Sequence, residues 1–192
     1  HWQCRRWITG FTGSAGTAVV THEEAALWTD SRYWLQAEEQ LADTPFALMK
    51  DLVDMPINAW LKARGACHDN WVVGFCPDMM VPDLKEELLC GVTSVALAED
   101  PFDELWKERP SFPLSMAEIM PLEYAGRSAA CKLRQLMDWM NANERSMLLV
   151  SELSEIMWLL NLRGSDIPYN PFIISFLLVK ANGQHIYYVH QE

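Results

Sequence analysis

Arg32 is the residue of this 192-residue sequence whose type and position best suit the binding of a ligand. It lies in the segment Thr29–Trp34 (TDSRYW), where a strand-like run gives way to a helical pattern. A guanidinium group stays charged and can grip a carboxylate or carbonyl oxygens through two parallel hydrogen bonds. From the residues alone, a simple surface ion pair with Asp30 is the favoured interpretation of Arg32. We expect Thr29 or Asp30 to cap the following helix, and Trp34 is a candidate neighbour of the bound ligand.

A second segment with chemical potential is the glycine-rich run GFTGSAG, which contains Gly10, Gly13 and Gly16. Its spacing is GxxGxxG, which is neither the dinucleotide fingerprint nor a P-loop, so a phosphate site is disfavoured. We expect these glycines to permit tight turns between a helix and a strand. Ser14 is not expected to be a nucleophile, because Thr12 stands where a nucleophile elbow needs glycine. Its hydroxyl is better suited to bonding the local backbone.

No pattern of metal ligands is visible in the sequence. The histidines form no HExxH motif, and the adjacent pair Cys67 and His68 lacks a second pair of ligands. We therefore expect neither a metal site nor a catalytic residue within these 192 residues. The histidines are His1, His22, His68, His185 and His190.

The charge, the apolar runs and the cysteines limit which partners the protein can bind and in which cellular compartment we expect it. The net charge of −11 argues against nonspecific binding to nucleic acid or to an anionic membrane. The longest apolar runs fall far short of the ~20 residues that a membrane span needs, and the first residues show no signal-peptide pattern. Five cysteines without a CxxC motif favour free thiols in a reducing compartment. We expect a cytoplasmic protein.

Two landmarks occur twice with the same separation. Gly-Ser is found only at Gly13 and Gly164, and each pair lies six residues after a tryptophan, Trp7 or Trp158. The offset is 151 residues for both landmarks (158 − 7 and 164 − 13). Each block leads into two β-like runs, and the Asn-Gly ending at Gly183 is a strong hairpin signal. This order favours a duplicated unit.

The two copies differ in the elements around this shared block. We expect residues 1–108 to form a first domain without its front end, 109–113 to form a linker, and 114–192 to form a second domain without its back end. Strands and helices alternate around hairpins, which predicts mixed α/β sheets. The expected helices are around 33–41, 82–89, 102–107 and 132–140, and a further short helix is expected to begin at Pro56. The expected strands are 17–21, 25–28, 46–49, 71–75, 92–96, 147–150, 172–179 and 185–189, with 147–150 buried.

Three motifs resemble the three-domain Xaa-Pro aminopeptidases, also called aminopeptidase P: RRWITGFTGSAGTA from Arg5, TDSRY from Thr29, and WLLNLRGSD from Trp158. That family consists of metal-dependent peptidases that release an N-terminal residue when proline follows it. The resemblance spans essentially the whole chain. It implies two related non-catalytic domains of the creatinase/prolidase N-terminal type, ribonuclease-H-like in fold. It also implies a missing third domain that holds two divalent metal ions, usually manganese.

The resemblance assigns roles to residues of this chain. In the family the arginine matched by Arg32 helps to bind the peptide substrate, although Ser31 stands where the family usually has glycine. Arg163 and Asp166 match a motif of the family's second domain. Their role could be an interdomain ion pair or part of the rim of the active site, and we favour the structural role. The other matching residues are read as structural: Gly10, Gly13, Ser14, Gly16, Asp30 and Gly164.

Two functions from different classes follow. The first is the N-terminal, non-catalytic part of a cytoplasmic Xaa-Pro metalloaminopeptidase, inactive by itself, supplying part of the substrate cleft and the contacts of a homodimer. The second is a non-enzymatic binding module, like the peptidase-related subunit of a histone chaperone, because an acidic chain suits basic partners. Creatine amidinohydrolase and prolidase share the fold but match these motifs less well.

Overall fold

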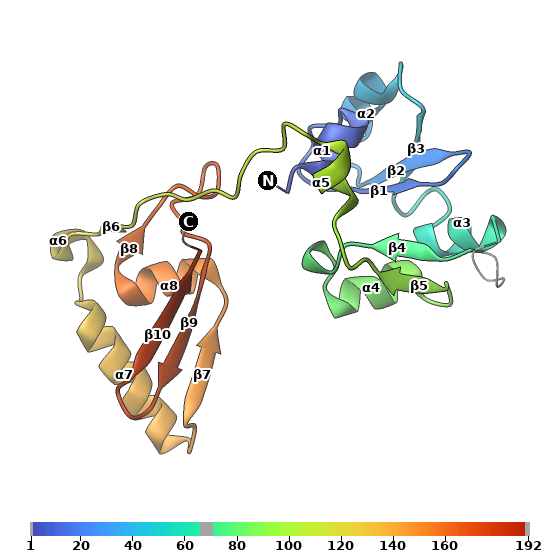
Figure 1. Cartoon of the computed structure of the whole chain (residues 1–192). Helices are drawn as coiled ribbons and strands as arrows, with labels where there is room; N and C mark the ends of the chain where they lie inside the picture. Colours follow the sequence, from blue (N-terminus) through green and yellow to red (C-terminus); the bar gives the residue numbers. More distant parts are fainter. Residues whose placement is uncertain (1, 66–70, 191–192) are drawn as a thin grey trace. The chain divides into compact units, whose positions relative to one another are not determined.

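A computed structural model describes residues 2–65 and 71–190 of the protein. The chain divides into two compact units, His1–Pro110 and Ser111–Glu192, which are considered separately below (Figure 1). Within the described residues, no helix combines the length and the apolar character that crossing a membrane would require.

The main sheet of the first unit is mixed, in keeping with the predicted α/β class, which is confirmed. Its strand order is β1-β2-β3, with β1 at Thr17–Val20, β2 at Ala25–Thr29 and β3 at Phe46–Lys50. Strands β1 and β2 form an antiparallel hairpin, and β3 runs parallel to β2. The connection between the parallel strands carries α2, Trp34–Leu41, as a crossover requires.

Both faces of this sheet are covered by helices. On one face, α1 (Cys4–Thr9) and α2 pack over β2 through a cluster whose fully buried members include Phe11 and Leu27. On the other face, α3 (Ile57–Ala63) and α4 (Pro82–Leu89) pack over the same strand. The residues in that second cluster are Ala26, Trp28, Ile57, Trp60, Leu61 and Leu89. Strand β2 is therefore buried on both sides.

The remainder of the first unit is a two-stranded parallel sheet of β4 (Val73–Phe75) and β5 (Ser94–Ala96). Both strands are shorter than the sequence predicts, because only three residues of each pair with the other. The connection contains the short 3₁₀ helix η1 (Pro77–Met79) and α4 (Pro82–Leu89), and α5 (Pro101–Leu105) follows β5.

The second unit is built on a three-stranded antiparallel sheet with the order β10-β9-β7. A two-stranded ladder of β6 and β8 lies elsewhere in the unit. The elements of the second unit, in chain order, are β6 (Glu118–Ile119), α6 (Leu122–Ala125), α7 (Ala129–Ala142), β7 (Met147–Val150), α8 (Leu153–Leu160), β8 (Leu162–Arg163), β9 (Ser175–Lys180) and β10 (His185–Val189).

Helices α7 and α8 cover one face of that sheet. Their core residues Met140, Ile156 and Met157 are fully buried against Leu177 and Val179 of β9. The expectation that β7 is buried throughout is wrong, because Met147 and Leu149 are exposed while Val150 is buried. Alternate residues of a strand point to opposite faces, and only one face of this sheet meets the helices.

The two units share an order of local features. The C-cap of helix α1 is Gly10 and that of α8 is Asn161, each in the left-handed conformation, with φ of 75° and 55°. These caps are also 151 residues apart (161 − 10). A glycine follows each cap at the same distance, and an antiparallel hairpin comes next in both units. This order supports duplication, and superposition of the two cores on the 151-residue offset stays a prediction.

A buried lysine completes the end of α8. The ammonium group of Lys132 donates to the carbonyl oxygen of Trp158 and to Oδ1 of Asn161, both at 2.7 Å. It also lies 4.2 Å from the centre of the Trp158 ring. Carbonyls in the last turn of a helix have no partner within the helix, so the lysine satisfies one of them and offsets the helix dipole. Burial, followed by repulsion from Arg163 and Arg127, lowers the pKa of Lys132.

We predict that Lys132→Met destabilises the protein by about 1–3 kcal/mol at pH 7, because two buried acceptors lose their donor. The folded state releases the lysine proton at a lower pH than the unfolded chain does. The wild type therefore gains stability as the pH rises toward 10.5, and the deficit of the variant should widen between pH 7 and pH 10. Denaturant unfolding at both pH values measures this. The control is Lys107→Met, at an exposed lysine, and an equal loss in both variants would contradict the proposed cap.

Candidate functional site

The candidate site begins where β2 ends. Thr29, the last residue of β2, is fully buried, and its hydroxyl donates to the carbonyl oxygen of Ala15 at 2.8 Å. The carbonyl of Thr29 accepts from the backbone of Asp51, at 3.0 Å, and from the indole nitrogen of Trp34, also at 3.0 Å. The ends of the parallel strands β2 and β3 are thereby tied together at the edge of the sheet where ligands bind in open α/β folds.

Asp30 and Arg32 form a bidentate pair on the turn that follows. Nε and Nη2 of Arg32 each donate to one carboxylate oxygen of Asp30 at 2.8 Å, and the backbone N–H of Arg32 donates to Oδ1 at 3.0 Å. The guanidinium also lies 5.3 Å from the centre of the Tyr33 ring. The side chain of Arg32 is 68% exposed. The pair therefore fixes the plane of the guanidinium, and Nη1 takes no part in it.

The pairing changes the protonation of both groups. The hydrogen bonds from Arg32 lower the pKa of Asp30 to about 2, and the same contact raises the pKa of Arg32 above its ordinary value. Burial, and then the neighbouring carboxylates of Asp30 and Glu87, raise the pKa of Asp51. At neutral pH, Asp30 and Arg32 are both charged, and together they form a neutral pair.

The expected N-cap of the following helix is wrong. Helix α2 begins at Trp34, its N-cap is Tyr33, and neither Thr29 nor Asp30 caps it. Both side chains are engaged elsewhere, Thr29 with Ala15 and Asp30 with Arg32. The surface pair with Asp30 that the residues alone favour for Arg32 is present in the structure.

Trp34 lies at the same strand edge. Its indole is half-buried and donates to Thr29, and the ammonium of Lys50 lies 5.5 Å from the centre of its ring. Lys50 also pairs with Glu38 of α2 at 2.7 Å. The ring is therefore held in place beside the Asp30–Arg32 turn.

The glycine-rich turn contacts this site through Ser14 and is itself held by Arg5 of α1. The hydroxyls of Ser14 and Tyr33 are 2.6 Å apart, so Ser14 bonds a side chain next to Arg32. Arg5 donates from Nη1 to the carbonyl of Gly16 at 2.6 Å and from Nη2 to the carbonyl of Gly13. Ser14 has neither a histidine nor a carboxylate as its partner in these contacts, which does not match a serine hydrolase.

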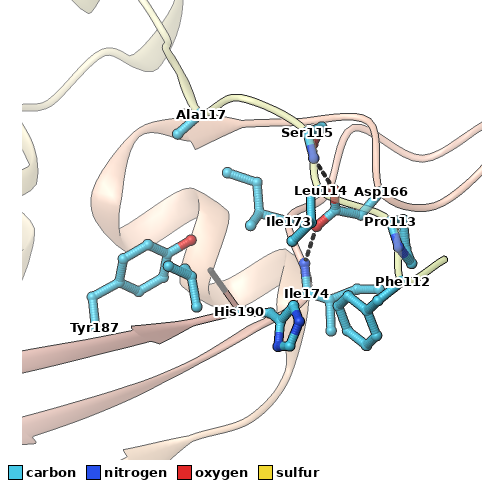
Figure 2. Close-up of a pocket in the computed structure, with 11 residues that line it drawn as sticks. Phe112, Pro113, Leu114, Ser115, Ala117, Asp166, Ile173, Ile174, Tyr187 and His190 are labelled. Carbon is cyan, nitrogen blue, oxygen red and sulfur yellow. Dashed lines mark hydrogen bonds between the residues drawn. The ribbon is translucent and has the colours of Figure 1, made fainter. Parts of the chain in front are cut away.

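The second matched motif lies in the other unit and carries a buried carboxylate. The two oxygens of Asp166 accept from the backbone N–H groups of Ser115 and Ile174, at 2.7 and 2.8 Å (Figure 2). A Cβ on the neighbouring Gly164 would collide with the side chain of Ile173. Asp166 thus holds the segment that leads into β6 against the segment that leads into β9.

Arg163 sits on β8, opposite Glu118 of β6 in the ladder. Its Nη1 donates to its neighbour's carbonyl, that of Leu162, at 2.7 Å, and to the carbonyl of Met157 at 3.4 Å. The small cavity beside Asp166, about 150 Å³, is lined mostly by apolar side chains. These contacts support the structural role that we favour for Arg163 and Asp166.

The residues present do not fit a catalytic metal site. Across residues 2–65 and 71–190, no three His, Cys, Asp or Glu side chains are grouped closely enough to hold a metal ion. Cys67 and His68, which the sequence singled out as an adjacent pair, lie outside the described residues.

Sequence reasoning missed Arg5, Lys50 and Ser115, which hold the candidate residues in place. Arg5 precedes its two acceptors by 8 and 11 residues, and Ser115 precedes Asp166 by 51. Contacts over such separations leave no periodic pattern in one sequence. The one local feature that could have drawn attention to Arg5 is the pair of adjacent arginines before Trp7.

Comparison with known proteins places both units in one family. Models described as the creatinase/prolidase N-terminal domain match residues 3–105 and, separately, residues 108–192.

Two relatives show how far the similarity extends. The chain is 39% identical to Xaa-Pro aminopeptidase 2 of Rattus norvegicus, over 93% of this chain and 27% of that protein. It is 37% identical to aminopeptidase P2 of Arabidopsis thaliana, over 95% of this chain and 27% of that protein. The chain therefore spans little more than a quarter of the length of these relatives.

A solved structure is similar over almost the whole chain. It is the X-prolyl aminopeptidase of Caenorhabditis elegans, described as a cytosolic enzyme with a di-nuclear active site. The TM-score is 0.80 and the identity is 30%, over 97% of this chain and 31% of that one.

We predict that the Asp30 carboxyl group titrates with a midpoint near pH 2, and that Arg32→Ala returns the midpoint toward 3.8. Both groups are exposed, so the pair contributes little to stability. Because the folded-state pKa of Asp30 is lowered, that small contribution is present above pH 3.8 and is lost as the pH falls through about 2. Carbon-detected NMR of the carboxylates measures both midpoints. A midpoint of Asp30 that does not respond to the substitution would show that the pair does not persist in solution.

Proposed function

Because this chain belongs to the creatinase/prolidase N-terminal domain family, we propose that it is the non-catalytic N-terminal part of a metal-dependent Xaa-Pro aminopeptidase. The longer protein, called the parent below, releases the N-terminal residue of a peptide whose second residue is proline. The observation that carries the proposal is the match of nearly the whole chain to the first part of enzymes with this activity in their names. The binding-module alternative has no such support.

The catalytic metal ions belong to the parent beyond these two units. The described residues offer no fitting ligand set, and the Caenorhabditis elegans relative is described as having a di-nuclear site. We propose two divalent ions, manganese in keeping with the family resemblance, whose chemistry is the activation of a water molecule. The chain described here contributes a wall of the substrate cleft and contacts of a homodimer. The cytosolic description of the same relative supports a cytoplasmic location.

Arg32 is the residue of this chain that we assign to the peptide substrate. Its Nε and Nη2 are engaged by Asp30, so the guanidinium plane is set before a ligand arrives. Nη1, with its two N–H groups, is not used by Asp30 and can donate to an acceptor of the substrate. Because the Asp30–Arg32 pair is neutral as a whole, a peptide carbonyl suits it better than a second carboxylate, which would compete with Asp30. Trp34 supplies an apolar surface next to this donor.

We predict that Arg32→Ala in the parent lowers kcat/KM for Xaa-Pro peptides roughly ten- to a hundred-fold, as expected for the loss of one hydrogen bond from a charged group. The melting temperature should stay unchanged, since the Asp30–Arg32 pair is exposed on the surface. Steady-state kinetics and thermal melting are measured on the same preparations.

The matched control is Arg6→Ala, which removes an exposed arginine from α1. It should alter neither the kinetics nor the melting temperature. Wild-type kinetics in Arg32→Ala would remove Arg32 from the substrate site. A large fall in its melting temperature would assign the residue a role in folding.

A further inference from the structure

The loop that joins β3 to α3 in the first unit, residues 51–56, exposes apolar side chains to solvent (Figure 1). Leu52 is fully exposed, and Val53 and Met55 are 66% and 47% exposed. We call these three residues, Leu52, Val53 and Met55, the apolar tip of the loop. A single exposed apolar residue is ordinary, but neighbouring ones on the same loop form a continuous apolar surface, which marks an interaction site.

The backbone conformation of Leu52 is unusual for its residue type. Its φ is 66°, in the left-handed region that leucine rarely adopts. Glycine, asparagine and aspartate adopt this region at a lower cost, so the preference of the local backbone does not account for a leucine here. Strained residues of this kind persist where the surrounding structure holds them, and they gather at sites that bind ligands.

Hydrogen bonds fix this loop at both ends. The backbone N–H of Lys50 donates to Oδ2 of Asp54 at 2.6 Å, and the N–H groups of Val53 and Asp54 donate to the carbonyl oxygen of Lys50 at 3.0 and 2.9 Å. At the other end, the carbonyl oxygen of Met55 accepts from the buried indole of Trp28 at 2.9 Å. The apolar tip is therefore carried on an ordered turn, so a ligand that binds it pays little for ordering the loop.

The apolar tip lies at the same sheet edge as Arg32. Strands β2 and β3 are parallel, and Thr29 at the end of β2 is paired with Lys50 at the end of β3. Asp51, the next residue, donates its backbone N–H to the carbonyl oxygen of Thr29, which also accepts from the indole of Trp34. The Arg32 turn and the loop therefore leave neighbouring strand ends, at the edge where open α/β folds bind ligands.

We propose that the apolar tip binds the part of the peptide substrate that follows the proline, and that it makes the parent prefer longer peptides with apolar residues there. This inference rests on the proposed function, because it places the tip beside the substrate contact of Arg32. An aminopeptidase releases one residue, so the whole remainder of the peptide lies after the reacting bond. Contacts made outside the metal centre therefore fall on that remainder.

The charges around the apolar tip favour the same kind of peptide. Asp51 and Asp54 border Leu52 and Val53 in the loop. An apolar stretch of peptide brings no charge next to these acidic side chains, whereas a C-terminal carboxylate is repelled by them. In a tripeptide the carboxylate belongs to the residue directly after the proline. A longer peptide carries its carboxylate farther from the loop and is better suited to it.

The test measures the kinetics of the parent and of its Leu52→Asn variant with peptides of different length. Asparagine accepts the left-handed conformation, so this change removes the apolar side chain and keeps the turn. The substrates are Ala-Pro-Gly, Ala-Pro-Gly-Phe-Leu and Ala-Pro-Gly-Ser-Asn. We expect the wild type to have its highest kcat/KM with the Phe-Leu pentapeptide. In Leu52→Asn, the ratio of this kcat/KM to that of the tripeptide should fall about five- to twenty-fold, mainly through a higher KM.

The matched control is Leu105→Asn, the same change at an exposed leucine of α5. It should leave the ratio of the two kcat/KM values at that of the wild type. The melting temperature and the mass of the parent are measured for both variants. Neither should change in Leu52→Asn, because the Leu52 side chain meets solvent when no substrate is bound.

An unchanged ratio in Leu52→Asn would overturn the inference, while activity of the parent on Ala-Pro-Gly would still support the proposed function. A lower melting temperature of the Leu52→Asn parent would show that the apolar tip packs against the rest of the parent, and a lower mass would show that it binds a second copy. Either result would overturn the inference as well. A parent that hydrolyses none of the three peptides would contradict the proposed function itself and the inference with it.

Discussion

The first unit depends on the close contact between the glycine-rich turn and the end of β2. A Cβ on Gly16 would lie 2.8 Å from the carbonyl oxygen of Trp28, so only glycine lets the two backbones approach this far. The hydroxyl of Thr29 donates to the carbonyl oxygen of Ala15 in the turn, and Arg5 donates to the carbonyl oxygen of Gly16. Because the turn is fixed there, Tyr33 meets Ser14, and the Asp30–Arg32 turn leaves the sheet in one defined direction.

The charge of the exposed Arg32 is neutralised by its neighbour Asp30, which also fixes its orientation. Asp30 holds two nitrogens of Arg32 and remains ionised at any physiological pH, since its pKa is lowered to about 2. The charge of the pair is therefore constant, and its geometry is set by a turn that the buried Thr29 anchors. The carboxylate of the second unit, Asp166, is different. It is buried, and each of its two oxygens accepts a hydrogen bond from a backbone N–H group.

The sequence predicted the helices and strands better than the contacts and burial of their side chains. The hairpins and the helices α2, α4 and α7 were recoverable because periodicity and turn residues such as Gly183 are local signals. Helices α1 and α8 were not predicted. The N-cap of α2 was not, since Asp30 was already engaged by Arg32, and side-chain competition of this kind has no sequence period. The exposure of Leu149 was also missed, because an apolar run reads as buried whether or not a neighbouring element covers it. Arg5 and Lys132 act through contacts that depend on the tertiary fold.

The central claim is that these two units belong to a Xaa-Pro aminopeptidase without containing its catalytic centre. The most direct measurement is the release of the N-terminal residue from a Xaa-Pro tripeptide, followed for the purified parent and for the 192-residue chain in the presence of manganese. The account predicts release by the parent, its abolition by a chelator, and none by the 192-residue chain. Manganese-dependent release by the 192-residue chain, or an inactive parent, would contradict it.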